Sequence, residues 1–271
     1  MAERRDELRD RLQRLEQLSR RRRKRSEMDS SALEDMECVV ARDGVLVFER
    51  DLGSLMSADA RSALVGRVRR ARDALRWRED IDAEVRELLE TPEGAVFLDT
   101  ETTGLGSAMV FLLGVMRVSG DDVILRQVFA RDYREEPALL QQWAGMLSKA
   151  DRLVSFNGKS FDMPVLRDRM GFHGILSPDE PPHLDLLHVS RRRWREVLPD
   201  CRLQTLEWRI CGRRRSGDIP GEEIPSAYHH FVRTGDPADM LSVLHHNALD
   251  LLTLADVAAA LALPDDESPR P

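Results

Sequence analysis

Hydrophobic and polar positions divide the chain into two parts of different texture. Leucines recur at helical spacing among charged residues over residues 3–18, which predicts an amphipathic helix. An arginine-rich run, RRRRKR at residues 20–25, follows and fits a solvated helix end or a phosphate-binding arm. GVLVFER at 44–50 predicts a strand, and residues 58–90 predict charged helices. We therefore treat residues 1–90 as a mainly helical N-terminal region with one short strand.

From residue 91 the apolar runs become short and continuous. Strands are expected at GAVFLD (94–99), MVFLLGVMRV (109–118) and DVILRQVFA (122–130), and their short connections predict an antiparallel meander. Strands RLVSF (152–156) and HLDLL (183–187) then alternate with helices, and the chain is mostly helical up to residue 262. This order predicts an α/β domain over 91–262, a mixed five-stranded sheet flanked by helices, followed by a tail at 263–271.

Composition narrows the classes of protein that fit this pattern. The 271 residues are 42% hydrophobic, which is enough for a core, and 41 basic against 48 acidic side chains leave a net charge of −7. Any nucleic-acid site must therefore be a local patch. The three cysteines form no CxxC and no zinc-finger spacing, which favours a reducing compartment. No signal peptide or membrane-spanning run is visible, so we expect a cytoplasmic protein without a membrane partner.

Acidic residues lie at three places at the edges of apolar elements. Asp99 ends a strand and Glu101 follows two residues later, so extended backbone places both carboxylates on one face while Thr100 points away. Asp162 opens a helix after a polar turn, and Asp250 lies in an apolar helix where an unpaired acid is costly to bury. Each position alone also fits an ordinary solvated acid or helix cap. Together they suggest oxygen ligands for a hard cation such as Mg²⁺ or Mn²⁺.

The ordered motifs carry a resemblance. VFLDTETTGLG, SFNGKSFDMPVLRDR, HLDLLH, GDIPGEEIPSAY and HNALDLLTLADV together resemble the YprB-like ribonuclease H-like domain family, a branch of the DEDD 3′→5′ exonuclease superfamily, over residues 94–262. The resemblance implies that two divalent cations, Mg²⁺ or Mn²⁺, promote phosphodiester hydrolysis. Their expected ligands, which are also catalytic residues, are Asp99, Glu101, Asp162 and Asp250.

Two adjacent histidines compete for the role of general base that completes the superfamily pattern. His246 lies four residues before Asp250 and shares its helical face, because four residues turn a helix to within about 40° of the same direction. His245 lies five residues before Asp250, about 140° away, and becomes available only if the helix starts later. We expect His246 to act as a neutral imidazole near pH 7 and keep His245 as the second choice.

Other residues are expected to contact or support a substrate. Thr102, Asn157 and Lys159 are expected to bind it, although the Asn-Gly turn explains Asn157 equally well. Asp185 resembles a further acidic position of the family and is expected behind the ligands. Arginine runs at 191–195 and 213–215 fit either a phosphate channel with Trp194 or Trp208 as a stacking surface, or solvent-facing arginines around a buried tryptophan.

The expected partner is DNA or RNA with a single-stranded 3′ end. A structure-selective endonuclease on the same metal site is the enzymatic alternative, and a non-catalytic nucleic-acid-binding module is the other. The choice between DNA and RNA depends on contacts to the 2′-hydroxyl that no motif reveals.

Overall fold

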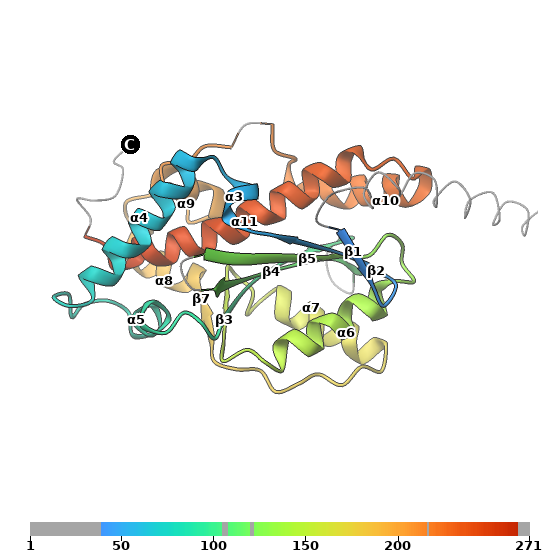
Figure 1. Cartoon of the computed structure of the whole chain (residues 1–271), viewed down its shortest axis with the longest axis horizontal. Coiled ribbons are helices and arrows are strands. Elements are labelled where there is room, and N and C mark those ends of the chain that lie inside the picture. The colour runs from blue at the N-terminus through green and yellow to red at the C-terminus, as the bar shows by residue number, and fades with distance from the viewer. Residues whose placement is uncertain (1–38, 105–107, 120–121, 216, 265–271) are drawn as a thin grey trace, which may run out of the picture.

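The structure is a computed structural model that describes residues 39–104, 108–119, 122–215 and 217–264 (Figure 1). A central sheet in this part of the chain has seven strands in the order β1-β2-β5-β4-β3-β6-β7. β3 pairs in parallel with β6, and β6 with β7, whereas the other neighbours are antiparallel. The strands are β1 (Val39–Arg42), β2 (Val45–Arg50), β3 (Ala95–Thr102), β4 (Val110–Ser119), β5 (Asp122–Phe129), β6 (Arg152–Ser155) and β7 (His183–Asp185).

The five strands expected between residues 91 and 187 are all present, and the mixed sheet with an antiparallel meander is confirmed. The sheet itself is wider than the expected five strands, because the hairpin β1–β2 extends it. β2 pairs with β5 along Leu46–Phe129 to Arg50–Leu125, which covers an edge whose backbone groups would otherwise be unpaired. The residues 45–48 of β2 are buried in the core.

Residues 39–90 therefore share the sheet and core of the chain that follows, while the division at residue 90 stays a prediction. The helices expected within 58–90 are present as α4 and α5, and α4 packs on the last helix. The amphipathic helix expected at 3–18 and the arginine-rich run at 20–25 lie outside the described residues.

Helices cover both faces of the sheet (Figure 1). α6 and α7 lie on one face, and the long helix α11 crosses the other face over β3 and β4, joined there by α4 and α9. The helices are α3 (Leu52–Leu55), α4 (Ala58–Ala74), α5 (Ala83–Glu90), α6 (Glu136–Leu147), α7 (Asp162–Phe172), α8 (Leu186–Trp194), α9 (Leu203–Arg209), the 3₁₀ turn η1 (Gly221–Glu223), α10 (Ile224–Thr234) and α11 (Ala238–Ala262).

Strand alternation separates the two cores on which these layers rest. On β3, Val96 and Leu98 join the core that includes α6 and α7, whereas Phe97 joins the core beneath α11. Burial of both faces explains why β3 reads as a continuous apolar run before Asp99. Asp99 has the parity of Phe97, so the strand delivers its carboxylate to α11.

α11 is a continuous 25-residue helix, and most of its side chains are buried. Its alanine- and leucine-rich sequence favours the helix, and the core against β3, β4 and α4 stabilises it. Among the described residues, no helix is both long and apolar enough to cross a membrane.

Candidate active site

Asp99 and Glu101 lie near the end of β3, as the spacing predicted. They share one face of the strand with Phe97, and the register between β3 and β4 shifts between Glu101 and Thr102. Such a bulge changes the direction in which the following side chains point. Thr102 is buried, and its hydroxyl donates to the carbonyl oxygen of Gly104 at 2.7 Å. A role for Thr102 in substrate binding stays a prediction.

Asn247 on α11 fixes the carboxylate of Asp99. Its amide Nδ2 donates to Asp99 Oδ2 at 2.7 Å and to the Asp99 carbonyl oxygen at 3.2 Å. Its Oδ1 accepts from Gln127 Nε2 at 2.7 Å, and Gln127 also donates to the carbonyl oxygen of Leu244. Both amide groups are fully buried, so each hydrogen bond restricts the position of the next side chain.

A glycine provides the room for this contact. Gly114 pairs with Asp99 on one side and with Gln127 on the other, and a Cβ at that position would lie 2.1 Å from Asn247 Oδ1. The Asn247 side chain therefore crosses over Gly114 of β4, which lies between Asp99 of β3 and Gln127 of β5. Only a glycine at this position lets the Asn247 side chain come so close to the strand.

Asp162 is fixed from the other face of β3. Thr100 points away from Asp99, as expected, and its Oγ1 donates to Asp162 Oδ1 at 2.5 Å. Thr100 and Asp162 are both buried. Neighbouring residues of β3 thus act on opposite faces of the sheet. Asp99 points towards α11, and Thr100 positions Asp162 at the start of α7.

Asp185 organises the turn that precedes Asp162. Its carboxylate accepts from the backbone N–H of Asn157 at 2.8 Å and of Lys159 at 3.2 Å, and it also caps α8 through Leu187 N–H at 3.1 Å. This agrees with its expected position behind the ligands. The side chains of Asn157 and Lys159 are exposed, and Asn157 has a φ of 65° that an asparagine in a tight turn tolerates.

Asp250 takes part in a dense group of charges. His246 Nε2 lies 3.4 Å from Asp250 Oδ2, and His246 Nδ1 lies 2.9 Å from Asp218 Oδ2. Arg215 donates to Asp250 Oδ1 and, through its second terminal nitrogen, to Asp218 Oδ2 at 3.1 Å. Asp250 is therefore held by a histidine one turn earlier and by a guanidinium from the loop after α9.

The structure separates the two histidines as helical geometry predicted. α11 is continuous through both residues, His246 is buried on the face of Asp250, and His245 is exposed. The choice of catalytic base itself stays a prediction.

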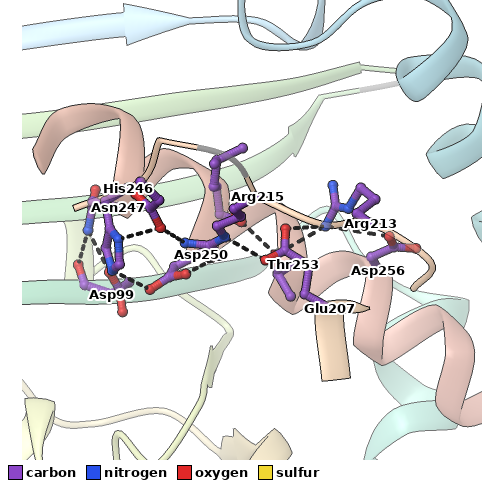
Figure 2. A network of polar contacts seen from close by, with 11 residues as sticks. Asp99, Glu207, Arg213, Arg215, His246, Asn247, Asp250, Thr253 and Asp256 are labelled. Carbon is purple, nitrogen blue, oxygen red and sulfur yellow. Dashed lines mark hydrogen bonds and ion pairs between the residues drawn. The ribbon is translucent and has the colours of Figure 1, made fainter. Parts of the chain in front are cut away.

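Polar contacts continue along α11 beyond Asp250 (Figure 2). Arg215 Nε donates to Glu207 at 2.5 Å, and Arg213 lies 3.7 Å from the other oxygen of Glu207 and 3.5 Å from Asp256. The polar network thus runs from Asp99 past Asp250 and then through alternating arginines and acids to Asp256 (Figure 2).

Three carboxyl groups carry raised pKa values. Burial is the main cause, and repulsion between the carboxylates adds to it. The pKa of Asp99 lies well above its ordinary value, that of Glu101 is about 8 and that of Asp162 about 6. For Asp250, burial is outweighed by His246 and Arg215, which lower its pKa. We call Asp99, Glu101, Asp162 and Asp250 the acidic cluster.

The surroundings of His246 favour its protonated form. Burial alone would lower its pKa, but the hydrogen bond and charge of Asp250, with the charges of Glu101 and Asp218, raise the pKa to about 9. A neutral imidazole near pH 7 stays a prediction for the site with cations bound. The sequence placed the histidine beside one carboxylate, whereas the fold surrounds it with three.

The acidic cluster fits a divalent cation by its chemistry. Its donors are all carboxylate oxygens, which suit Mg²⁺ or Mn²⁺, and their mutual repulsion is the kind that a cation relieves. Among the described residues, no three acidic, histidine or cysteine side chains converge closely enough to hold one metal ion as they stand. Part of the reason is visible at Asp250, whose oxygens are occupied by Arg215 and His246.

Several residues of the site carried no assigned role in the sequence. Asn247 belongs to the motif HNALDLLTLADV and Asp218 to GDIPGEEIPSAY. Their places in these motifs are the sequence features that could have marked them as site residues. Arg215 belongs to the arginine run at 213–215, and the run does not indicate which of its side chains reaches the site. Gly114 and Gln127 gave no signal, because their importance follows from the strand register.

Comparison with known proteins agrees with the fold. Residues 96–262 match the family model described as the RNase_H superfamily. The uncharacterized protein YprB of Bacillus subtilis (strain 168) is 40% identical over an alignment of 165 residues, and the match covers 58% of this chain and 39% of YprB. The chain thus spans well under half the length of this curated relative.

A solved structure shares the fold. The family B DNA polymerase from the hyperthermophilic archaeon Pyrobaculum calidifontis superposes with a TM-score of 0.50 and 17% sequence identity. The match covers 60% of this chain and 24% of the polymerase chain. At this identity the likeness concerns the fold alone.

Proposed function

This chain belongs to the RNase_H superfamily, and from that premise we propose that it is a divalent-metal-dependent nuclease that removes nucleotides from the 3′ end of single-stranded DNA or RNA. The acidic cluster carries the proposal. Asp99 and Glu101 from β3, Asp162 from α7 and Asp250 from α11 come from three separate elements, and burial with mutual repulsion raises three of their pKa values. The 3′→5′ polarity rests on the resemblance to DEDD exonucleases.

The acidic cluster would hold two cations, Mg²⁺ or Mn²⁺, through Asp99, Glu101, Asp162 and Asp250. When bound, such ions supply activation of water and stabilisation of the leaving 3′ oxygen. Asn247 and Thr100 keep the carboxylates of Asp99 and Asp162 in place through hydrogen bonds of 2.7 and 2.5 Å. Ligands held in this way lose little freedom on binding, which favours affinity.

The chain's own residues would bind the substrate and move the proton. Asp185 holds the turn that exposes Asn157 and Lys159, and these two side chains are proposed to contact the phosphodiester backbone. His246 is proposed to take the proton from the attacking water. If the charges of Asp250 and Glu101 are offset by a bound cation, two of the three charges that raise the pKa of His246 are weakened, while Asp218 still orients the ring through Nδ1 at 2.9 Å. The pKa then falls towards the range in which an imidazole acts as a base near pH 7.

The test is degradation of 5′-labelled single-stranded DNA and RNA with Mg²⁺ or Mn²⁺. We expect a ladder that shortens from the 3′ end and disappears in Asp99→Ala. His246→Ala and His245→Ala form a matched pair on adjacent helical positions. The first should lower the rate about 100-fold or more, within the usual contribution of a general base, and the second should retain it.

Other results identify the alternatives. Cleavage of a substrate blocked at its 3′ end would replace the exonuclease with an endonuclease on the same site. Binding without cleavage under either metal would favour a non-catalytic module. Unchanged Mn²⁺ affinity in Asp99→Ala would remove Asp99 from the ligand set.

A further inference from the structure

The three consecutive arginines after α9 have different environments. Arg213 is bound to Thr253 Oγ1 at 3.0 Å and lies near Glu207 and Asp256, and Arg215 is bound to Glu207, Asp218 and Asp250. Arg214 between them is exposed. Arg213 and Arg215 thus point inward and form ion pairs, whereas Arg214 points to solvent. The contacts of its two neighbours hold the backbone of Arg214 in place.

Arg214 lies against an exposed tryptophan. Its guanidinium carbon is 4.9 Å from the centre of the Trp208 ring, and that of Arg209 is 3.9 Å from the same ring. Trp208 is 44% exposed. Within the described residues, neither Arg209 nor Arg214 has a carboxylate at ion-pair distance, so the ring is flanked by two positive charges without an acidic partner.

The other arginine run lacks these properties. Trp194 is 3% exposed, and Arg193 beside it donates to the carbonyl oxygens of Leu261 and Leu263. Arg192 is paired with Asp82. Trp194 therefore belongs to the core, with Arg193 bonded beside it, and of these two tryptophans only Trp208 presents an exposed ring.

A groove beside Trp208 is lined by two residues that contact Asp250 and His246. It has a volume of about 410 Å³ and is lined by Gln204, Trp208, Arg214, Arg215, Asp218 and Pro220 among others. This volume lies within the range of about 300–1,000 Å³ typical of small-molecule sites. Arg215 and Asp218 belong to the groove wall and also contact Asp250 and His246. A ligand in the groove would therefore lie one side chain away from the acidic cluster.

We infer that Trp208 and Arg214 bind an unpaired nucleotide of a single-stranded DNA or RNA beside the acidic cluster. One base can stack on the ring in place of the Arg214 guanidinium, which lies over it at the longer distance of 4.9 Å, and the guanidinium groups of Arg214 and Arg209 then pair with the flanking phosphates. Because bases in a duplex are already stacked on one another, the site selects single strands. The inference rests on the proposed function in that the bound strand is then cleaved, whereas binding itself can be measured without cleavage.

The test is binding of fluorescein-labelled (dT)12 and (U)12 in EDTA at low salt, followed by fluorescence anisotropy. Trp208→Ala should weaken binding by about 5- to 150-fold, the equivalent of one base–aromatic stack. Trp208→Phe should restore most of the affinity because it keeps a ring. Arg214→Gln should reduce the slope of log affinity against log salt by about 0.7, the loss of one phosphate contact.

Matched controls separate this site from general surface effects. Trp77 is also exposed, at 63%, and lies after α4, so Trp77→Ala should bind both oligonucleotides like the wild type. A blunt duplex of the same length should bind Trp208→Ala and the wild type equally. If Trp208→Ala fails to fold by circular dichroism, Arg214→Gln and Trp208→Phe still decide the result.

The inference fails if Trp208→Ala binds (dT)12 and (U)12 as tightly as the wild type, or if the wild type binds neither at 100-fold excess of protein over probe. This outcome is distinct from failure of the proposed function. Binding that depends on Trp208 without cleavage in any metal would leave the nucleotide site standing alone. Cleavage that ignores Trp208 would leave the nuclease and remove the site.

Discussion

Carboxylates at two places in the fold, the start of α6 and the end of β3, have opposite electrostatics. Glu136 at the start of α6 is 1% exposed and accepts from Val110 N–H at 2.9 Å, from Arg169 Nε at 2.8 Å and from His173 Nε2 at 2.7 Å. Burial alone would raise its pKa, but these partners outweigh burial and lower it. We call Glu136, Arg169 and His173 the compensated site.

Asp99 and Glu101, the two members of the acidic cluster on β3, have no such balance. At Asp99 and Glu101 the pKa is raised by burial and by neighbouring carboxylates, and Asn247 gives Asp99 a neutral amide as a partner. A buried charge with full compensation stabilises the fold, whereas charges that repel one another in the folded chain destabilise it. The difference separates an acid that stabilises the fold from the acids that are proposed to hold a cation.

The largest effect is expected for Glu101→Gln. This change replaces a carboxyl whose pKa burial and neighbouring carboxylates raise to about 8 with an amide that cannot ionise, and so removes an oxygen ligand that can carry a charge. We expect single-turnover cleavage to slow by about 1,000-fold or more, since a metal contributes several kcal/mol of charge stabilisation. Relief of repulsion should raise the thermal midpoint by about 2–4 °C, the shift for 1 kcal/mol in a chain of this size. A lower midpoint would show that Glu101 is compensated after all.

The opposite result is expected for Glu136→Gln. Arg169, whose side chain is 14% exposed, would keep a buried charge without its carboxylate. We expect a loss of about 3–5 kcal/mol in the free energy of unfolding, measured with urea. Glu180→Gln is the control, because its pair with Arg167 is partly exposed and should contribute less than about 1 kcal/mol. Cation affinity should stay unchanged, since the compensated site lies across the sheet from Asp99.

A smaller effect is expected behind Asp99. Asn247→Ala frees the Asp99 carboxylate, and Gly114→Ala displaces Asn247 through the 2.1 Å approach of a Cβ. Both should weaken Mn²⁺ binding by about 10- to 100-fold in calorimetry, as is usual for residues that orient ligands. His245→Ala, two residues away on the exposed side of α11, should bind Mn²⁺ like the wild type. Equal affinity in all variants would mean that Asp99 is positioned without Asn247.

The smallest effect concerns pH. The pKa of Glu136 is lower in the folded chain than its ordinary value of 4.5. Its contribution to stability is therefore fully present above about pH 4.5 and is lost as pH falls through the folded pKa. We expect the difference in free energy of unfolding between wild type and Glu136→Gln to be constant from pH 7 to 5 and to shrink below about pH 4.5. A difference that grows on acidification would assign the wrong sign to the shift.

Local pattern predicted much of the fold because it depends on neighbours in sequence. The alternation of apolar runs located β3 to β7, and period-two spacing placed Asp99 and Glu101 on one face with Thr100 on the other. The four-residue spacing of His246 and Asp250 likewise predicted their shared face on α11. These relations need only the geometry of one strand or one helix.

The N-terminal hairpin shows where local pattern stops. GVLVFER predicts a strand, but nothing within it says that β2 pairs with β5, about 80 residues later. Two tryptophans near arginine runs make the same point. Trp194 lies inside the run at 191–195 and Trp208 lies before the run at 213–215, yet the first is 3% and the second 44% exposed, because each helix turns a different face to the core.

By itself, the sequence determined the order of strands and helices, the family motifs and the residues of the acidic cluster, because each follows from spacing along one element or from a motif. Only the tertiary structure decided how those residues are held and charged. Asn247 reaches Asp99 across 148 positions over Gly114, and Arg215 reaches Asp250 across 35. Hydrogen bonds and pKa values depend on the distance through space, which strand register and helix packing set together.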